Sequence, residues 1–181
     1  KPLFNEFLKV SIFVVEWFEN KFKASFDLPH LQIVSHNGFR HYAMENYGLI
    51  TCPDESEWMR IDGKFVITHE IIHQWFGDSV SIKWWDSIWL NEGFASFLEY
   101  IIMEEYGYDG DIWLKFTHFK SANALTYFDN GVISPSPNDI DFENMFDQLL
   151  YSKGAYIVKM FYDIIGREDF FKFCTKWLHQ L

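Results

Sequence analysis

The stretch Thr68-His69-Glu70-Ile71-Ile72-His73-Gln74-Trp75 places two histidines four residues apart, with a glutamate directly after the first. One turn of an α-helix takes 3.6 residues, so side chains at i and i+4 share a face and two imidazoles there can bind one metal ion. Neutral imidazole suits zinc, and a catalytic zinc site takes three protein ligands and keeps a fourth position for water. The stretch therefore predicts a helix that supplies His69 and His73 to zinc, with Glu70 as general base.

The residues around this stretch predict that the helix is buried. Inside a buried helix, two unpaired histidines and a carboxylate are costly unless something binds them. This cost favours the metal interpretation over a chance occurrence of the pattern. Asp62-Gly63 is expected to cap the start of the helix, and Gly77 is expected to end it. The apolar residues that predict burial are Phe65, Val66, Ile67, Ile71, Ile72, Trp75 and Phe76.

A second predicted helix carries the third ligand that the site needs. Apolar residues recur at helical spacing from Asn91 to Tyr106, and Gly107 offers a stop. Glu92 lies in the first turn of this helix and completes a His2Glu zinc set. Glu99 follows two turns later on the same face. It is either an acceptor for the second N–H of a ligand histidine or a solvated surface glutamate.

These residues and three further strings resemble the M1 family of zinc aminopeptidases, within the thermolysin-like gluzincins. Eighteen residues separate His73 from Glu92, and Glu92 is the second residue of the string Asn91-Glu92-Gly93-Phe94. The strings that match in the same order are Ala43-Met44-Glu45-Asn46-Tyr47-Gly48-Leu49, Trp84-Trp85-Asp86 and Tyr151-Ser152-Lys153-Gly154-Ala155.

The resemblance implies a helix-rich α+β fold, the thermolysin-like catalytic domain, with a small sheet near the N-terminal third. It implies one Zn²⁺ per chain and an aminopeptidase that cleaves the first bond of peptides with a free N-terminus. Glu45 would bind the substrate's α-amino group, in an extended segment with Ala43, Met44 and Asn46. Tyr151 would donate a hydrogen bond to the oxyanion. Without the resemblance, Tyr156 is an equal candidate for that donor.

One position departs from the family pattern. The family motif begins with glycine, whereas this chain has Tyr42 before Ala43. Glycine lets a backbone approach a ligand closely, so Tyr42 predicts a narrower cleft, an altered preference or weaker catalysis. Three alternatives stay open: a weak or inactive zinc-bound peptide-binding module, an endopeptidase, and an epoxide hydrolase using the same site.

Composition agrees with a piece of such an enzyme. The 181 residues are 49 % hydrophobic and 20 % aromatic, which predicts one domain, residues 1–181, with a large core. The net charge of −11 argues against a nucleic-acid partner. No stretch predicts a membrane span or a signal peptide, and no N-x-S/T acceptor occurs. These features lean toward a cytoplasmic chain, while an extracellular or membrane-anchored parent stays open.

The chain is expected to be a domain excised from a larger protein. Family members flank this domain with others that complete the cleft, so the piece is expected to bind zinc but to have weak activity alone. Cys52 and Cys174 are too few for a disulfide framework, and their pairing stays open.

Other segments are assigned by pattern. Trp84, Trp85 and Trp89 are expected to pack in the core. Helices are predicted at residues 3–22, 111–128 and 170–181 and from Tyr151 to Gly166, and strands at residues 31–35 and 47–51.

Overall fold

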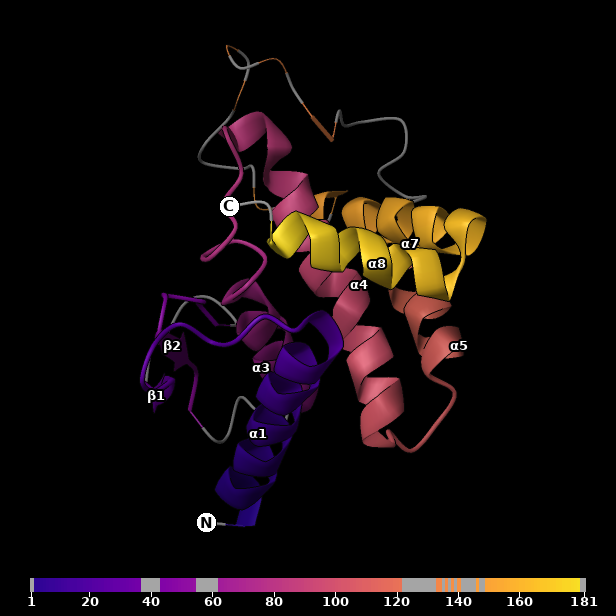
Figure 1. The fold of residues 1–181 in the computed structure, drawn as a ribbon. Coiled ribbons are helices and arrows are strands. Elements are labelled where there is room, and N and C mark those ends of the chain that lie inside the picture. The colour runs from indigo at the N-terminus through magenta and orange to yellow at the C-terminus, as the bar shows by residue number, and fades with distance from the viewer. Residues whose placement is uncertain are drawn as a thin grey trace. The chain divides into compact units, whose positions relative to one another are not determined.

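The computed structural model describes residues 2–36, 43–54, 62–121, 133–134, 136, 138, 140, 146 and 149–179. The chain divides into two compact units, whose helices and strands are labelled in Figure 1. One unit comprises Lys1–Val80 with Phe173–Leu181, and the other comprises Ser81–Lys172. Each unit is built mainly from helices, and the first also holds a two-stranded sheet. The predicted helix-rich α+β fold with a small N-terminal sheet is therefore confirmed.

Two helices, α1 (Pro2–Phe22) and α3 (Gly63–His73), form the centre of the first unit. Aromatic rings fill the space between α1 and the chain that follows α3. Phe18 stacks on Trp75 with 4.7 Å between ring centroids, and Phe22 meets Phe76 edge-on at 6.1 Å. All four of these side chains are at most 2 % exposed. Their burial stabilises the packing of α1 against the end of α3.

The sheet pairs β1 (Gln32–Ser35) with β2 (Leu49–Cys52) in parallel, so that Gln32 is opposite Leu49. On its other side, β2 receives an isolated antiparallel bridge between Met44 and Thr51. The backbone groups of these two residues exchange hydrogen bonds of 2.8 and 3.0 Å. The segment before β2 is therefore folded back along the strand.

The second unit is organised around α4 (Ile88–Tyr106). The ring of Phe97, on this helix, meets those of Phe116, Tyr162 and Phe170 at 6.1, 5.3 and 5.7 Å. Gly107, with φ of 87°, ends α4 as predicted. The unit's other elements are η1 (Trp85–Ser87), α5 (Ile112–Phe116), π-helical turns at Thr117–Ser121 and Leu149–Lys153, α7 (Gly154–Ile165) and the start of α8 (Arg167–Leu178).

Helices α4 and α7 touch through two glycines. A Cβ on Gly93 would lie 2.8 Å from the carbonyl carbon of Gly154, and a Cβ on Gly154 would lie 3.1 Å from the Cα of Gly93. Only residues without side chains allow backbones to approach this closely. The contact joins the residue after Glu92 to the residue three positions after Tyr151.

Several local predictions need correction. Asp62 is the cap residue of α3, but it has φ of 51° and no capping bond from its side chain. Helix α3 ends at His73, because the next residues form tighter turns before Gly77. Trp84 and Trp85 are 50 % and 41 % exposed, so their predicted core packing is wrong.

The predicted helix at 111–128 is also revised. It becomes the short α5, followed by a π-helical turn to Ser121. Asp111 caps α5, since its side chain accepts from the backbone N–H of Leu114 at 2.9 Å. The remainder of the predicted range lies outside the described residues.

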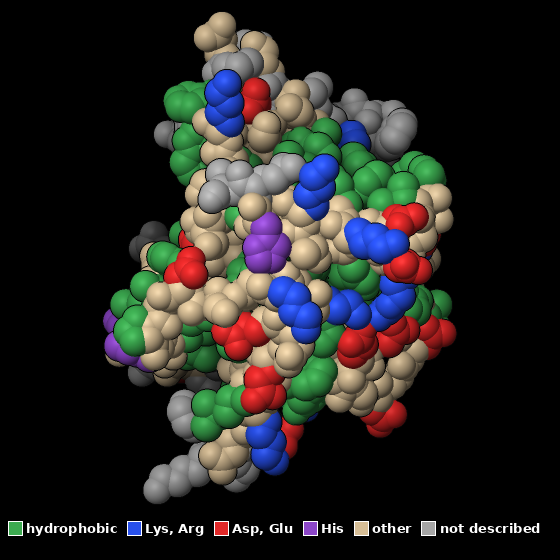
Figure 2. Space-filling model, in the orientation of Figure 1, with side chains coloured by type: hydrophobic (Ala, Val, Ile, Leu, Met, Phe, Trp, Pro, Cys, Tyr) green, Lys and Arg blue, Asp and Glu red, His purple; other side chains and the backbone are tan. Residues whose placement is uncertain are grey.

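The exposed face seen in Figure 2 carries Lys and Arg side chains interspersed with Asp and Glu side chains. Charged residues also pair along helix surfaces, such as Lys172 with Glu168 at 2.7 Å. Among the described residues, no helix has the length and apolar character to cross a membrane. Cys52 and Cys174 are both buried and form no disulfide with each other.

Candidate active site

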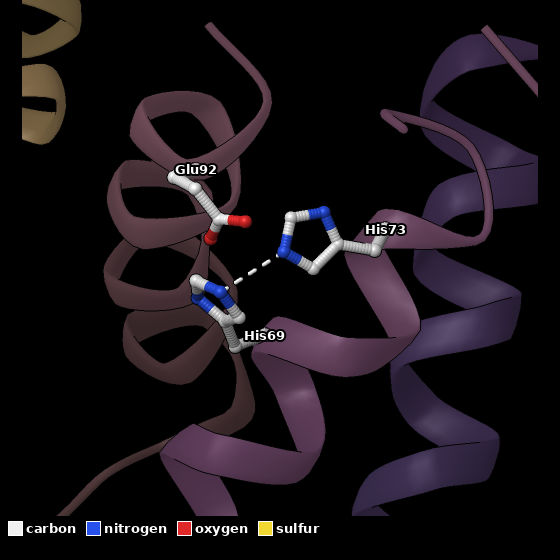
Figure 3. A group of neighbouring side chains, drawn as sticks. All are labelled: His69, His73 and Glu92. Carbon is white, nitrogen blue, oxygen red and sulfur yellow. Dashed lines mark hydrogen bonds between the residues drawn. The ribbon is translucent and has the colours of Figure 1, made fainter. Parts of the chain in front are cut away.

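Helix α3 presents its two histidines on one face, as the spacing predicts. The Nε2 atoms of His69 and His73 lie 3.0 Å apart (Figure 3). Two nitrogens bound at about 2.05 Å to one tetrahedral zinc ion would be separated by about 3.3 Å. The pair is thus close to the spacing that a shared ion requires.

A second contact orients His73. Its Nδ1 lies 2.9 Å from the carbonyl oxygen of Phe76, which can only accept, so Nδ1 carries the proton. The unprotonated Nε2 is then the ring nitrogen that can act as a metal ligand. His73 is 1 % exposed, whereas His69 is partly exposed. The chain therefore holds one imidazole fixed in the tautomer that a zinc ligand needs.

The two glutamates with the other predicted roles, Glu70 and Glu92, are both buried. Glu70 is 6 % exposed on α3, and Glu92 is 3 % exposed near the start of α4. Figure 3 draws His69, His73 and Glu92 as a group that could hold a metal ion. Two imidazoles and one carboxylate are the donor set of hydrolytic zinc sites, so these residues fit the metal that the sequence predicts.

The predicted substrate segment lies in the first unit beside β2. Met44 bridges to Thr51, and the side-chain amide of Asn46 donates to the Thr51 hydroxyl at 3.3 Å. Ala43 and Glu45 are partly buried, while Met44 is 44 % exposed. The backbone next to Glu45 is thus anchored to the strand through Met44. Tyr42 and His41 lie outside the described residues.

A carboxyl that the sequence did not single out lies near Glu45. Burial, followed by the negative charge of Glu45, raises the pKa of Asp78 to about 7, while His73 opposes this rise. The backbone N–H of Asp78 donates to the carbonyl oxygen of His73 at 3.0 Å. The carboxyl of Asp78 is therefore close enough to Glu45 and to His73 to be affected by the charge of each.

Tyr151 lies in the π-helical turn Leu149–Lys153, immediately before α7. This turn packs on α4, the helix that carries Glu92. Tyr151 is partly buried and the next residue, Ser152, is 1 % exposed. Tyr156, the other candidate, is 41 % exposed on α7. Isolated π-helical turns often occur at functional sites, because the extra residue redirects a side chain.

Glu99 is not a solvated surface residue. It is 6 % exposed and lies 3.3 Å from the Nζ of Lys120. Lys120 also lies over the ring of Tyr100, 5.9 Å from its centroid. A buried ion pair of this kind fixes the carboxylate in one orientation. The suggested role of Glu99 as acceptor for a ligand histidine stays a prediction.

Sequence reasoning missed Gln74, the residue after the second histidine. Its side chain is 1 % exposed and makes hydrogen bonds to the segment that carries Glu45. The available signal was a single amide side chain placed between His73 and the apolar residues Trp75 and Phe76. A buried amide of this kind needs partners, although sequence alone does not name them.

Comparison with known proteins places these residues in a family. The model of the peptidase family M1 domain matches residues 7–181. The chain belongs to the peptidase M1 family. Its His-Glu helix, the Glu92 helix and the Tyr151 turn are all inside the matched region of this M1 domain.

Three M1 relatives illustrate the similarity. The chain is 33 % identical over 180 residues to tricorn protease-interacting factor F2 of Thermoplasma volcanium, covering 92 % of this chain and 23 % of the relative. It is 35 % identical over 181 residues to probable aminopeptidase 2 of Sulfurisphaera tokodaii, covering 91 % and 23 %. It is 31 % identical over 177 residues to leucyl aminopeptidase of Saccharolobus solfataricus, covering 90 % and 22 %. The M1 chain described here thus spans about a quarter of the length of these relatives.

Proposed function

We propose that this chain is the zinc-binding catalytic part of an aminopeptidase that removes the first residue of peptides with a free N-terminus. The observation that carries the proposal is the histidine pair, with its Nε2 atoms 3.0 Å apart on a buried helix. Membership of the M1 family supports the same activity. Two of the relatives have aminopeptidase in their names.

His69, His73 and Glu92 would hold the zinc ion. Each offers one ligand atom, and these atoms lie within 4.8 Å of one another. A zinc ion there would supply Lewis acidity, which makes water nucleophilic near neutral pH and polarises a carbonyl group. The hydrogen bond from Nδ1 of His73 to the Phe76 carbonyl supports His73 as a zinc ligand, because it keeps the other ring nitrogen, Nε2, deprotonated.

Glu70 would move the proton. Its carboxylate would take a proton from the attacking water and return it to the leaving amine. Burial to 6 % exposure favours such a role, since a carboxylate shielded from solvent keeps a defined orientation. Tyr151 would donate its O–H to the oxygen of the tetrahedral intermediate and lower the barrier by about 3 kcal/mol.

Glu45 would distinguish an aminopeptidase from an endopeptidase. A carboxylate that binds a cationic α-amino group sets the distance from the N-terminus to the reacting bond. The segment Ala43–Asn46 that carries Glu45 is fastened to β2 through Met44 and Thr51, which supports this anchoring role. The remainder of the cleft would come from flanking domains, so the isolated chain should bind zinc but turn over slowly.

The test compares an unblocked aminoacyl fluorogenic substrate with its N-acetylated form, using full-length, zinc-quantified protein. We expect cleavage of the unblocked substrate alone. Glu70→Gln should abolish it without loss of zinc, and Glu45→Gln should raise KM. Cleavage of both substrates would indicate an endopeptidase. One zinc per chain with cleavage of neither would favour an inactive peptide-binding module and make Tyr42→Gly the next variant.

A further inference from the structure

We infer that Gln74 is a positioning residue, whose side-chain amide fixes the backbone around Glu45 relative to the histidine helix. The inference rests on the proposed function, because Glu45 matters only if it anchors a substrate amine. All groups involved belong to the first unit. Gln74 would thus set the position of Glu45, the residue proposed to bind the α-amino group of the substrate.

The amide of Gln74 uses both of its polar ends. Its Oε1 accepts from the backbone N–H of Gly48 at 2.8 Å, and its Nε2 donates to the carbonyl oxygen of Glu45 at 2.8 Å. The second N–H of Nε2 is directed to Oδ2 of Asp78 at 3.1 Å, and the Glu70 carbonyl lies farther away at 3.5 Å. An N–H partner on one side and a carbonyl on the other allow only one orientation of the amide.

The backbone between these two contacts is a tight turn. The N–H of Leu49 donates to the carbonyl of Asn46 at 2.7 Å, and Gly48 has φ of +75°, a conformation that favours glycine. The bridge from Met44 to Thr51 closes the other end. Glu45 is therefore held between two fixed points, of which one is the β2 strand and the other is Gln74.

The location of Gln74 ties this turn to the metal-binding helix. Gln74 is the C-cap residue of α3, and its own N–H donates to the Ile71 carbonyl. It directly follows His73, so a rigid helix end connects the ligand nitrogen with the Glu45 carbonyl. Its side chain is 1 % exposed, and water does not compete for these bonds.

No other residue of similar size can make this set of bonds. Methionine keeps the length but loses both donor and acceptor. Glutamate keeps an acceptor for Gly48 but places a carboxylate against the Glu45 carbonyl and against Asp78. Either change frees the Glu45 segment to shift, and a displacement of about 1 Å at a binding group can cost up to ~100-fold in rate.

The test uses full-length, zinc-loaded protein with Gln74→Met and Gln74→Glu. We expect KM for the unblocked aminoacyl substrate to rise roughly tenfold, with kcat lowered less than about threefold. Zinc content should match the wild type. In a Glu45→Ala background, the same Gln74 changes should have no further effect on KM, because the group that they displace is gone. If Gln74→Met does not fold, Gln74→Glu alone tests the inference.

Trp75→Phe is the matched control. Trp75 is the next residue, is 2 % exposed, and its Nε1 donates to the Ala24 carbonyl at 3.1 Å, away from Glu45. Losing this hydrogen bond should lower the free energy of unfolding and leave KM for the unblocked substrate unchanged. The inference is wrong if the Gln74 variants raise KM equally with and without Glu45, or if they lose zinc and kcat together. A wild type that does not cleave the unblocked substrate would instead refute the proposed function.

Discussion

Replacing Gly93 by alanine should separate two helices at the candidate site. The new Cβ would lie 2.8 Å from the carbonyl carbon of Gly154 and 3.0 Å from its Cα and its oxygen. These atoms all belong to backbone, so no side chain can rotate away. Reaching an ordinary contact of 3.4 Å requires a shift of about 0.6 Å between α4 and α7.

The expected cost follows from two opposing effects. Overpacking of this kind costs about 1–3 kcal/mol, while alanine in place of glycine stabilises a helix interior by about 0.5–1 kcal/mol. Gly93→Ala should therefore lower the free energy of unfolding by about 1–2 kcal/mol. Gly154→Ala should cost less, because its Cβ would meet the Trp89 carbonyl oxygen at 3.0 Å and the Gly93 Cα at 3.1 Å.

The shift should also lower activity. Gly93 follows Glu92, and Gly154 comes three residues after Tyr151, so separating the helices moves the proposed oxyanion donor relative to a proposed zinc ligand. We expect kcat to fall roughly tenfold in full-length, zinc-loaded Gly93→Ala protein. Urea unfolding and steady-state kinetics below the melting temperature measure the two effects.

Gly107→Ala is the control. Gly107 has φ of 87°, and a Cβ added there would meet no atom within 4 Å, so alanine should add about 1 kcal/mol of backbone strain without moving α7. Its kcat should equal that of the wild type. The reasoning is refuted if Gly93→Ala keeps wild-type stability and kcat, or if Gly107→Ala loses as much kcat as Gly93→Ala.

Three further outcomes are expected. Lys120→Met should lower the free energy of unfolding in urea by about 2–4 kcal/mol, because it leaves the buried Glu99 carboxylate without the charge of Lys120. Adding Glu99→Gln should recover most of this loss, and additive losses in the double variant would contradict the reasoning. Burial raises the pKa of Cys174, so iodoacetamide at pH 8 should label it slowly in native protein and fully in denaturant, as mass spectrometry can follow. A hydrogen bond from Lys64, with the charges of Lys64 and Lys9, holds the pKa of Glu6 below its usual 4.5. The resulting small stabilisation should be present above pH 4.5 and fade as pH falls through the lower folded value, so Lys64→Met should narrow the difference in melting temperature between pH 7 and pH 3.

The residues that local spacing governs were predicted well. Periodicity of 3.6 placed His69 and His73 on one helical face, and Gly107 at the end of α4. The two strands were also located, within about two residues. Predictions that depended on surroundings did less well: Trp84 and Trp85 are large and apolar, yet exposed. Hydrophobicity measures what a residue gains by burial, and it does not say whether a partner surface reaches that residue.

The sequence by itself determined the helical spacing of the histidines, the donor types of the candidate metal site and the family to which the chain belongs. Tertiary structure alone decided that Gln74 reaches Gly48 and Glu45, 26 and 29 residues away, and that Gly93 meets Gly154. The physical reason is that a helical repeat is set by bonds between near neighbours. Contacts between distant segments depend on how whole elements pack, and many packings are compatible with the same local pattern.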